Sequence, residues 1–191
     1  MMQPSEWRCI PRSAMTQWRP RDDHLVDGGG ERCREGGRIG CRVRAVPTLD
    51  AEDAAQLVGF AIGAAKALGV PQNVAVVDPA GALLAFHRMD GAKPYTAAFA
   101  IAKARTAAGL HVATQRLAEI ATPGERGFGL NSLKGGDVAI LGGGVPVVVD
   151  GAVVGAIGIS SGTVHEDAEI ADRAVQDFGD YITRATRPAG S

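Results

Sequence analysis

Residues 74–108 constrain the fold of this chain more than any other stretch, because they combine two strands, a turn and a helix of small residues. The apolar runs at 74–77 and 83–89 predict the strands, and the Asp78-Pro79-Ala80-Gly81 sequence between them is typical of a tight turn. The alanine-rich residues 95–112 predict a helix that can pack closely on a sheet. A hairpin followed by such a helix indicates an α+β domain.

The rest of the chain adds three predicted strands and two predicted helices. Strands are expected at 138–141, 145–149 and 153–160, and apolar residues at three- and four-residue spacing predict helices over about 48–68 and 165–185. Because hairpins dominate this order, the five strands should form an antiparallel sheet with the helices packed on it.

The first 45 residues differ in composition from the rest. They contain nine arginines and no lysine, together with all three cysteines and both tryptophans of the chain. Two interpretations stay open: a basic arm that binds something anionic, or translated sequence upstream of a true start at Met15 or near Val46. We therefore expect a disordered basic tail over 1–45 and a folded domain over 46–187.

Composition also limits the partners and the compartment. The net charge of −1 gives no indication of a nucleic-acid or membrane partner. The cysteine-free domain fits a reducing compartment. The chain shows neither a run of about 18 apolar residues, as a membrane span needs, nor the apolar core of a secretory signal. A cytoplasmic location is therefore expected.

Five short motifs, taken in order, carry a resemblance to a known family. They are Val76-Val77-Asp78-Pro79-Ala80-Gly81, Arg88-Met89-Asp90-Gly91, Lys103-Ala104-Arg105-Thr106-Ala107-Ala108, Gly142-Gly143-Gly144-Val145-Pro146 and Gly155-Ala156-Ile157-Gly158-Ile159-Ser160. With their flanking helices, over about residues 47–180, they resemble the GlcG/HbpS family of small bacterial proteins with a haem-degrading domain. That family is similar to the C-terminal domain of the PduO cobalamin adenosyltransferases. The resemblance implies a profilin-like fold with five antiparallel strands, a homo-oligomer, and haem or another tetrapyrrole as ligand.

Arg88 and Asp90 are the first candidate site residues, at the end of the second predicted strand. An arginine can bind a carboxylate as a fork while the aspartate orients it. Alternatively, the two form an ion pair that holds the Gly91 turn. Lys103 lies among alanines, where it meets an anionic ligand or, alternatively, either buries its stem with its charged end in water or pairs with Asp90.

His111 and Thr114 are the candidates to lie near an iron atom. A neutral imidazole can ligate haem iron, although a lone histidine is more often a surface residue. The resemblance implies an iron-ligating threonine, and Thr114 is its nearest match. The chain has Ala113-Thr114 where relatives usually have a Pro-Thr pair. No separate metal site is predicted.

Two functions of different classes are compatible with these residues. The first is a small ligand-binding protein of the GlcG/HbpS type, in which Arg88 and Lys103 bind the carboxylates of haem or another tetrapyrrole. The second is a catabolic enzyme acting on a small carboxylate or hydroxy acid, in which Asp90 or Lys103 is the general acid or base. A third possibility is an accessory or sensor subunit with neither activity.

Overall fold

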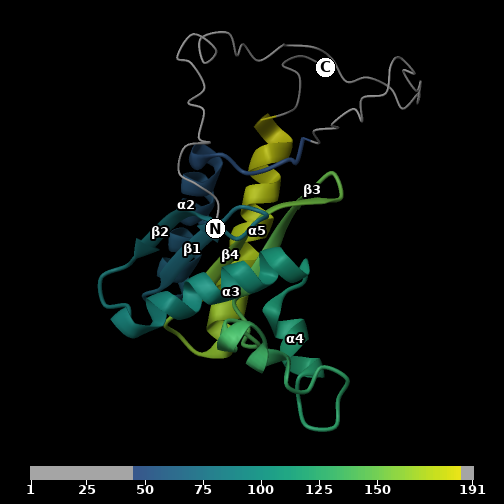
Figure 1. Ribbon diagram of the computed structural model, residues 1–191. Helices are drawn as coiled ribbons and strands as arrows, with labels where there is room; N and C mark the ends of the chain where they lie inside the picture. The colour runs from purple at the N-terminus through teal and green to yellow at the C-terminus, as the bar shows by residue number, and fades with distance from the viewer. Residues whose placement is uncertain (1–44, 186–191) are drawn as a thin grey trace, which may run out of the picture. The chain divides into compact units, whose positions relative to one another are not determined.

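Residues 45–185, which the computed structural model describes, contain four strands in one antiparallel sheet with the order β2-β1-β4-β3 (Figure 1). The strands are β1 (Asn73–Val77), β2 (Leu83–Arg88), β3 (Gly144–Val149) and β4 (Ala152–Ser160). The helices are α2 (Ala51–Leu68), η2 (Pro94–Thr96), α3 (Ala97–Leu110), α4 (Thr114–Ile120), η3 (Leu130–Gly136) and α5 (Val164–Ala185). The α+β class and the antiparallel sheet are confirmed. The tail predicted over 1–45 lies, up to position 44, outside the described residues.

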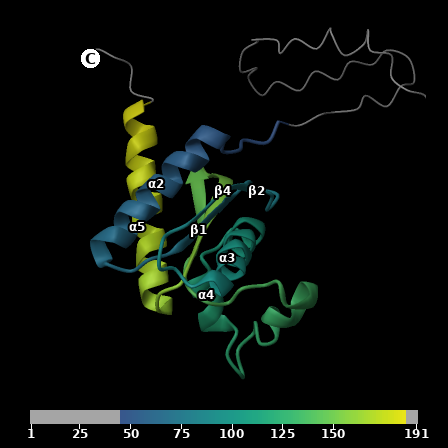
Figure 2. The ribbon, with the colours of Figure 1, turned by 90° about the vertical axis from the view of Figure 1, so that its left-hand side faces the viewer.

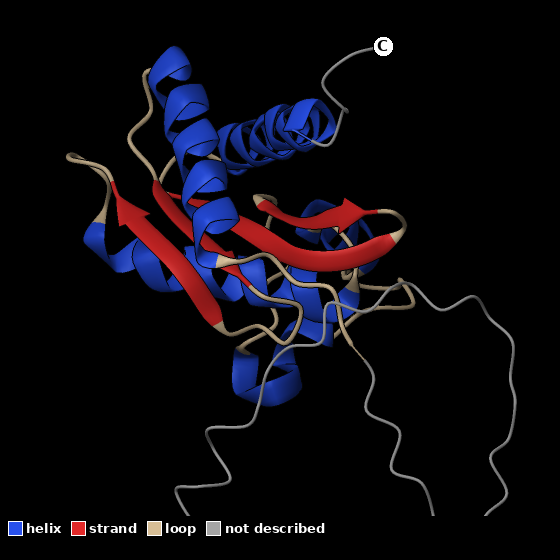
Figure 3. Ribbon diagram, turned by 90° about the horizontal axis from the view of Figure 1, so that it is seen from above, coloured by secondary structure: helices blue, strands red, loops and turns tan. Residues whose placement is uncertain are grey.

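The sheet separates two layers of helices. Helices α2 and α5 pack together on one face, and α3 covers the other (Figures 2 and 3). Large side chains fill the α2–α5 side, among them Leu57, Ile157, Ile159, Ile170 and Phe178. Small ones fill the α3 side, among them Ala75, Ala100, Ala104, Ala107 and Ala156. The small residues of α3 therefore serve the close approach that the sequence predicts.

Gly158 on β4 sets how closely α3 approaches the sheet. A Cβ at this position would collide with the carbonyl oxygen of Ala100 and lie 2.6 Å from the backbone nitrogen of Ala104. Both atoms belong to the backbone of α3, so no side-chain rotation relieves the contact. The helix can lie where it does only because residue 158 has no side chain.

Side-chain caps define where the two outer helices begin. At α2, the Asp50 carboxylate accepts a hydrogen bond from the backbone N–H of Asp53 at 2.8 Å. At α5, the N–H of Thr163 donates to Oε2 of Glu166 at 2.7 Å, and the N–H of Glu166 donates to Oγ1 of Thr163 at 3.2 Å.

The strand predicted at 138–141 is wrong, and the described sheet has four strands instead of five. The N–H of Ala139 donates to Oγ1 of Thr106 at 2.9 Å, and Oγ1 of Thr114 donates to the carbonyl of Leu141 at 2.6 Å. Because helix hydroxyls satisfy these backbone groups, the segment needs no neighbouring strand. The profilin-like assignment stays a prediction.

The central helix ends earlier than the sequence predicts. Helix α3 stops at Leu110 and not near 112, because His111 has a left-handed backbone with φ of 55°.

None of the helices within residues 45–185 combines the length and the hydrophobicity that a membrane crossing requires.

Candidate functional site

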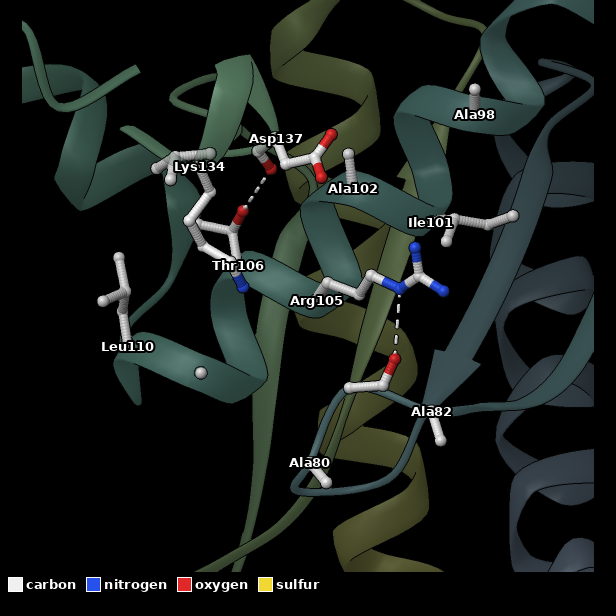
Figure 4. A pocket seen from close by; sticks show the side chains of 13 residues that line it. Ala80, Ala82, Ala98, Ile101, Ala102, Arg105, Thr106, Leu110, Lys134 and Asp137 are labelled. Carbon is white, nitrogen blue, oxygen red and sulfur yellow. Dashed lines mark hydrogen bonds between the residues drawn. The ribbon is translucent and has the colours of Figure 1, made fainter. Parts of the chain in front are cut away.

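A groove of about 790 Å³ lies between the β1–β2 turn, the outer side of α3, and the η3 region (Figure 4). The turn contributes Ala80, Gly81 and Ala82, and the η3 region contributes Lys134, Asp137 and Val138. Its volume is in the range of small-molecule pockets, about 300–1,000 Å³. We take this groove as the candidate functional site.

The helix wall of the groove is mainly apolar. Helix α3 contributes Ala98, Ile101, Ala102, Gly109 and Leu110 to it. Ala98, Ala102, Gly109 and Leu110 lie away from the core face of α3, which Ala100, Ala104 and Ala107 form, while Ile101 borders the groove and also packs against that core. A helix face of small and aliphatic side chains suits an apolar ligand that lies along it.

Three charged side chains also line the groove: Arg105 on α3, Lys134 in η3, and Asp137 directly after η3. Nε of Arg105 donates to the carbonyl of Gly81 at 3.1 Å, which ties the helix to the β1–β2 turn. Figure 4 shows the side chain of Lys134 reaching from η3 toward α3. None of the three forms an ion pair within the described residues. The two cations are therefore free to pair with an anionic ligand.

A second depression, of about 370 Å³, lies beside the start of α2 and the end of α5. Among the described residues, Asp53 is the charged group that lines it. Burial, followed by the nearby carboxylates of Asp50 and Glu52, raises the pKa of Asp53 above its ordinary value. A carboxylate among other carboxylates disfavours an anion, so this depression is a poorer candidate for the predicted ligand.

Lys103, a predicted ligand-binding residue, is buried on the sheet side of α3 and does not line the groove. Its Nζ atom donates to Oδ2 of Asp167 at 2.7 Å and to the carbonyl of Ile159 at 2.9 Å. Lys103 therefore pairs with Asp167 and not with Asp90, the partner considered from the sequence.

Arg88 and Asp90 lie exposed at the end of β2 and in the turn after it. In the described part of the chain, the ion pair between them is not formed, and neither residue lines the groove. Their role as a ligand clamp stays a prediction, at a place separate from the groove.

His111 and Thr114 have different surroundings. Thr114 is fully buried, and its Oγ1 donates to the carbonyl of Leu141 and accepts from the N–H of Gly144 at 2.9 Å. His111 is exposed and directly follows Leu110, the last groove residue of α3. Within residues 45–185, no group of three or more His, Cys, Asp or Glu side chains is placed to hold a metal ion.

The structure therefore does not bring the five predicted site residues together, and it adds three that sequence reasoning missed. Arg105 follows Lys103 by two positions, which turns it to the opposite side of the helix. This spacing could have indicated from the sequence alone that Arg105 lies on the exposed side of the helix when Lys103 is buried. Lys134 and Asp137 come from a long loop with special backbone angles, and no sequence pattern placed them against α3.

Comparison with known proteins gives one family and several relatives. The model of the family described as "Haem degrading protein HbpS-like" matches residues 49–176. An uncharacterized 15.0 kDa protein of Citrobacter freundii is 37% identical over 61% of this chain and 83% of its own length. The corrinoid adenosyltransferase PduO of Salmonella typhimurium is 36% identical over 66% of this chain, but the match spans only 38% of that protein.

Two solved structures resemble this chain closely. The Klebsiella pneumoniae protein ORFY has a TM-score of 0.70 and 30% identity, and the match covers 74% of this chain and 98% of that one. A complex of PduOC with haem has a TM-score of 0.65 and 36% identity, and the match covers 68% of this chain and 94% of that one.

Proposed function

Since the chain belongs to the HbpS-like family, we propose that it binds an anionic tetrapyrrole such as haem in the groove between α3, the β1–β2 turn and η3. The observation that carries the proposal is that Arg105 and Lys134, neither of them in an ion pair with a described residue, lie beside an apolar helix face. The solved PduOC structure, itself a haem complex, supports the same class of ligand.

The groove residues fit the chemistry of a tetrapyrrole. The macrocycle is flat and apolar, and would lie against the small side chains of α3. Its carboxylates would pair with the guanidinium of Arg105 and the ammonium of Lys134, since charge-assisted hydrogen bonds are the strong ones. Arg105 keeps its terminal N–H groups for this purpose, because its hydrogen bond to Gly81 uses Nε.

The groove lining, as residues 45–185 form it, includes no histidine, methionine, cysteine or tyrosine, which are the usual axial ligands of haem. His111 directly follows the groove residue Leu110 and is exposed, so we propose it as the residue that would bind the iron. Thr114 is a weaker candidate, because its hydroxyl is buried and already bonded to Leu141 and Gly144. Bound haem iron would supply redox chemistry, while the chain's own residues bind and orient the group.

A small-carboxylate enzyme is the alternative, and Asp137 is the observation that favours it. Asp90 and Lys103, the acid–base candidates from the sequence, lie outside the groove, whereas Asp137 lines it without an ion pair to any described residue. In that case Arg105 would bind the carboxylate of the substrate. Asp137 would act as the general base that accepts a proton from another group of the substrate.

We also propose that the protein is a homo-oligomer, as the family resemblance implies. Strand β2 is at an edge of the sheet, and Leu83 and Phe86 on it are 44% and 40% exposed. Tyr95 and Phe99 are 82% and 43% exposed and pack edge to face, with ring centroids 5.5 Å apart. An edge strand with exposed apolar side chains favours pairing with a second copy. The cytoplasmic location stays a prediction.

A haemin titration of the full chain tests the proposed site. The Soret band should grow to saturation in the wild type, and an Arg105→Ala/Lys134→Ala variant should bind haemin at least about tenfold more weakly, because hydrogen bonds to charged groups contribute about 1.5–3 kcal/mol. His111→Ala should shift the band. Arg88→Ala is the matched control, an exposed arginine outside the groove, and should bind as the wild type does.

Other outcomes of the titration would overturn the proposal. Loss of binding in Arg88→Ala with normal binding in the double variant would place the ligand at the end of β2. A broad band that never saturates would indicate adsorption to the surface. Calorimetry would then measure the binding of small hydroxy acids. Binding that is lost in the double variant would support the enzyme alternative.

A further inference from the structure

Two threonine hydroxyls fix the segment that leads from the groove to β3. Thr106 on α3 accepts from the N–H of Ala139 at 2.9 Å and donates to the carbonyl of Asp137 at 3.5 Å. Thr114 on α4 donates to the carbonyl of Leu141 and accepts from the N–H of Gly144. The segment 137–144 is thus held by one hydroxyl at its start and another at its end.

The first of these contacts belongs to the groove itself. Thr106 lines the groove together with Asp137 and Lys134. The hydrogen bonds of its hydroxyl to Asp137 and Ala139 connect the η3 side of the groove to α3. Figure 4 shows the dashed bond from Thr106 to Asp137 next to the side chain of Lys134.

Among the described residues, the loop before this contact makes no hydrogen bond to α3. Within the described part of the chain, the hydrogen bonds of residues 122–136 stay within the loop or run to the carbonyl of Ile120 on α4. The backbone also takes left-handed angles at Lys134, Gly135 and Gly136, with φ of 51°, 72° and 96°. The position of Lys134 therefore depends on residues 137–139, where Thr106 makes the first bond to α3.

We propose that Thr106 is a positioning residue for the ligand: its hydroxyl sets the distance between the wall carrying Lys134 and the wall carrying Arg105. This inference rests on the proposed function, because it assigns Thr106 a role in binding through Lys134. The hydroxyl does not itself need to touch the ligand, since its bonds to Ala139 and Asp137 already occupy it.

The test compares Thr106→Val, which keeps the shape and removes the hydroxyl, with Thr106→Ser, which keeps the hydroxyl. Ser132→Ala is the matched control, because its hydroxyl bonds to Gly129 within the loop. Amide hydrogen exchange over residues 134–141 is measured without ligand, and haemin affinity is measured on the same proteins. We expect faster exchange at Ala139 and haemin affinity lower by roughly two- to tenfold in Thr106→Val, the effect of one hydrogen bond. Thr106→Ser should restore both, and Ser132→Ala should change neither.

The two measurements separate the failure of this inference from the failure of the proposed function. Unchanged amide exchange in Thr106→Val would show that the Thr106 hydroxyl does not hold residues 137–139, and would overturn the inference. Faster exchange with unchanged haemin affinity, in a protein that binds haemin, would overturn the positioning role. If wild-type protein shows no saturable haemin binding, the proposed function fails and the positioning role of Thr106 fails with it, whatever the exchange data show.

Discussion

Lys103 and Asp167 form a buried ion pair, with Nζ 2.7 Å from Oδ2 and side chains that are 3% and 4% exposed. Asp167 also accepts hydrogen bonds from Nε2 of Gln72 and from the N–H of Gly162, both at 3.0 Å. The pair therefore joins α3 to the start of α5 and to the chain just before β1. We expect Lys103→Met to lower the free energy of unfolding by about 3–5 kcal/mol, because it leaves a buried carboxylate without its counter-charge. Urea denaturation measures this change.

The double variant Lys103→Met/Asp167→Leu is the control for that prediction. Replacing both partners by apolar residues removes the uncompensated charge, so the double variant should be more stable than either single variant. Additive losses in the double variant would show that the ion pair does not couple the two positions.

The close contact of α3 with Gly158 predicts a large effect of one methyl group. Gly158→Ala places a Cβ against backbone atoms of Ala100 and Ala104, so it should destabilise the fold by about 1–3 kcal/mol or more. Gly59→Ala on α2 is the matched control, because nothing lies within 4 Å of its added Cβ, and it should stabilise the helix by about 0.5–1 kcal/mol. Thermal denaturation compares the two, and equal effects would contradict the close approach.

The capping pair of Thr163 and Glu166 predicts a pH dependence of stability in acid. The hydrogen bonds from Thr163, its backbone N–H first, lower the pKa of Glu166 below its ordinary value of 4.5. The unfolded chain therefore takes up a proton at higher pH than the folded one does. The stabilisation is complete above the ordinary pKa and is lost as the pH falls through the lowered one.

Glu166→Gln tests this sign. We expect the variant to be less stable than the wild type near neutral pH, and the difference should shrink as the pH falls through that window. Glu169→Gln is the control, since Glu169 is exposed on the same helix and takes no part in the cap. Urea denaturation at a series of pH values decides, and a constant difference between Glu166→Gln and wild type would be inconsistent with the lowered pKa.

The exposed edge of β2 predicts the surface through which copies associate. Phe86→Glu introduces charge on this edge, so it should shift the protein toward monomer in size-exclusion chromatography with light scattering. Val148→Glu is the matched control on β3, the opposite edge of the sheet, where Val148 is 55% exposed. Dissociation by Val148→Glu with no effect of Phe86→Glu would move the interface to the other edge.

The elements that the sequence predicted correctly are those with a local signal. The turn at 78–81 and the apolar spacing of the outer helices each depend on residues that lie close together in the sequence. The strand expected at 138–141 fails for the opposite reason. Its apolar run resembles a strand, but its backbone partners are hydroxyls on Thr106 and Thr114, more than twenty residues away.

The candidate site was harder to predict than the fold, because its groups come from separate segments. Lys103 looked like a binding residue because its buried partner, Asp167, is 64 positions away in the chain. In the sequence, Arg105 stood out only as part of a family motif and not as a binding residue. The face of α3 that lines the groove can be identified only after the face that packs on the sheet is known. Lys134 joins it through a loop whose path depends on tertiary contacts.

The pairing of β1 with β4 has a consequence for how the chain folds. Asn73 lies opposite Ser160 and Val77 opposite Ala156, so the centre of the sheet joins segments about 80 residues apart. The β1–β2 and β3–β4 hairpins can form early and locally, but each leaves an apolar surface uncovered until the other arrives. The centre of the sheet therefore cannot close until residue 160 has left the ribosome, and a chain that ended before β4 would lack the strand that joins β1 to β3.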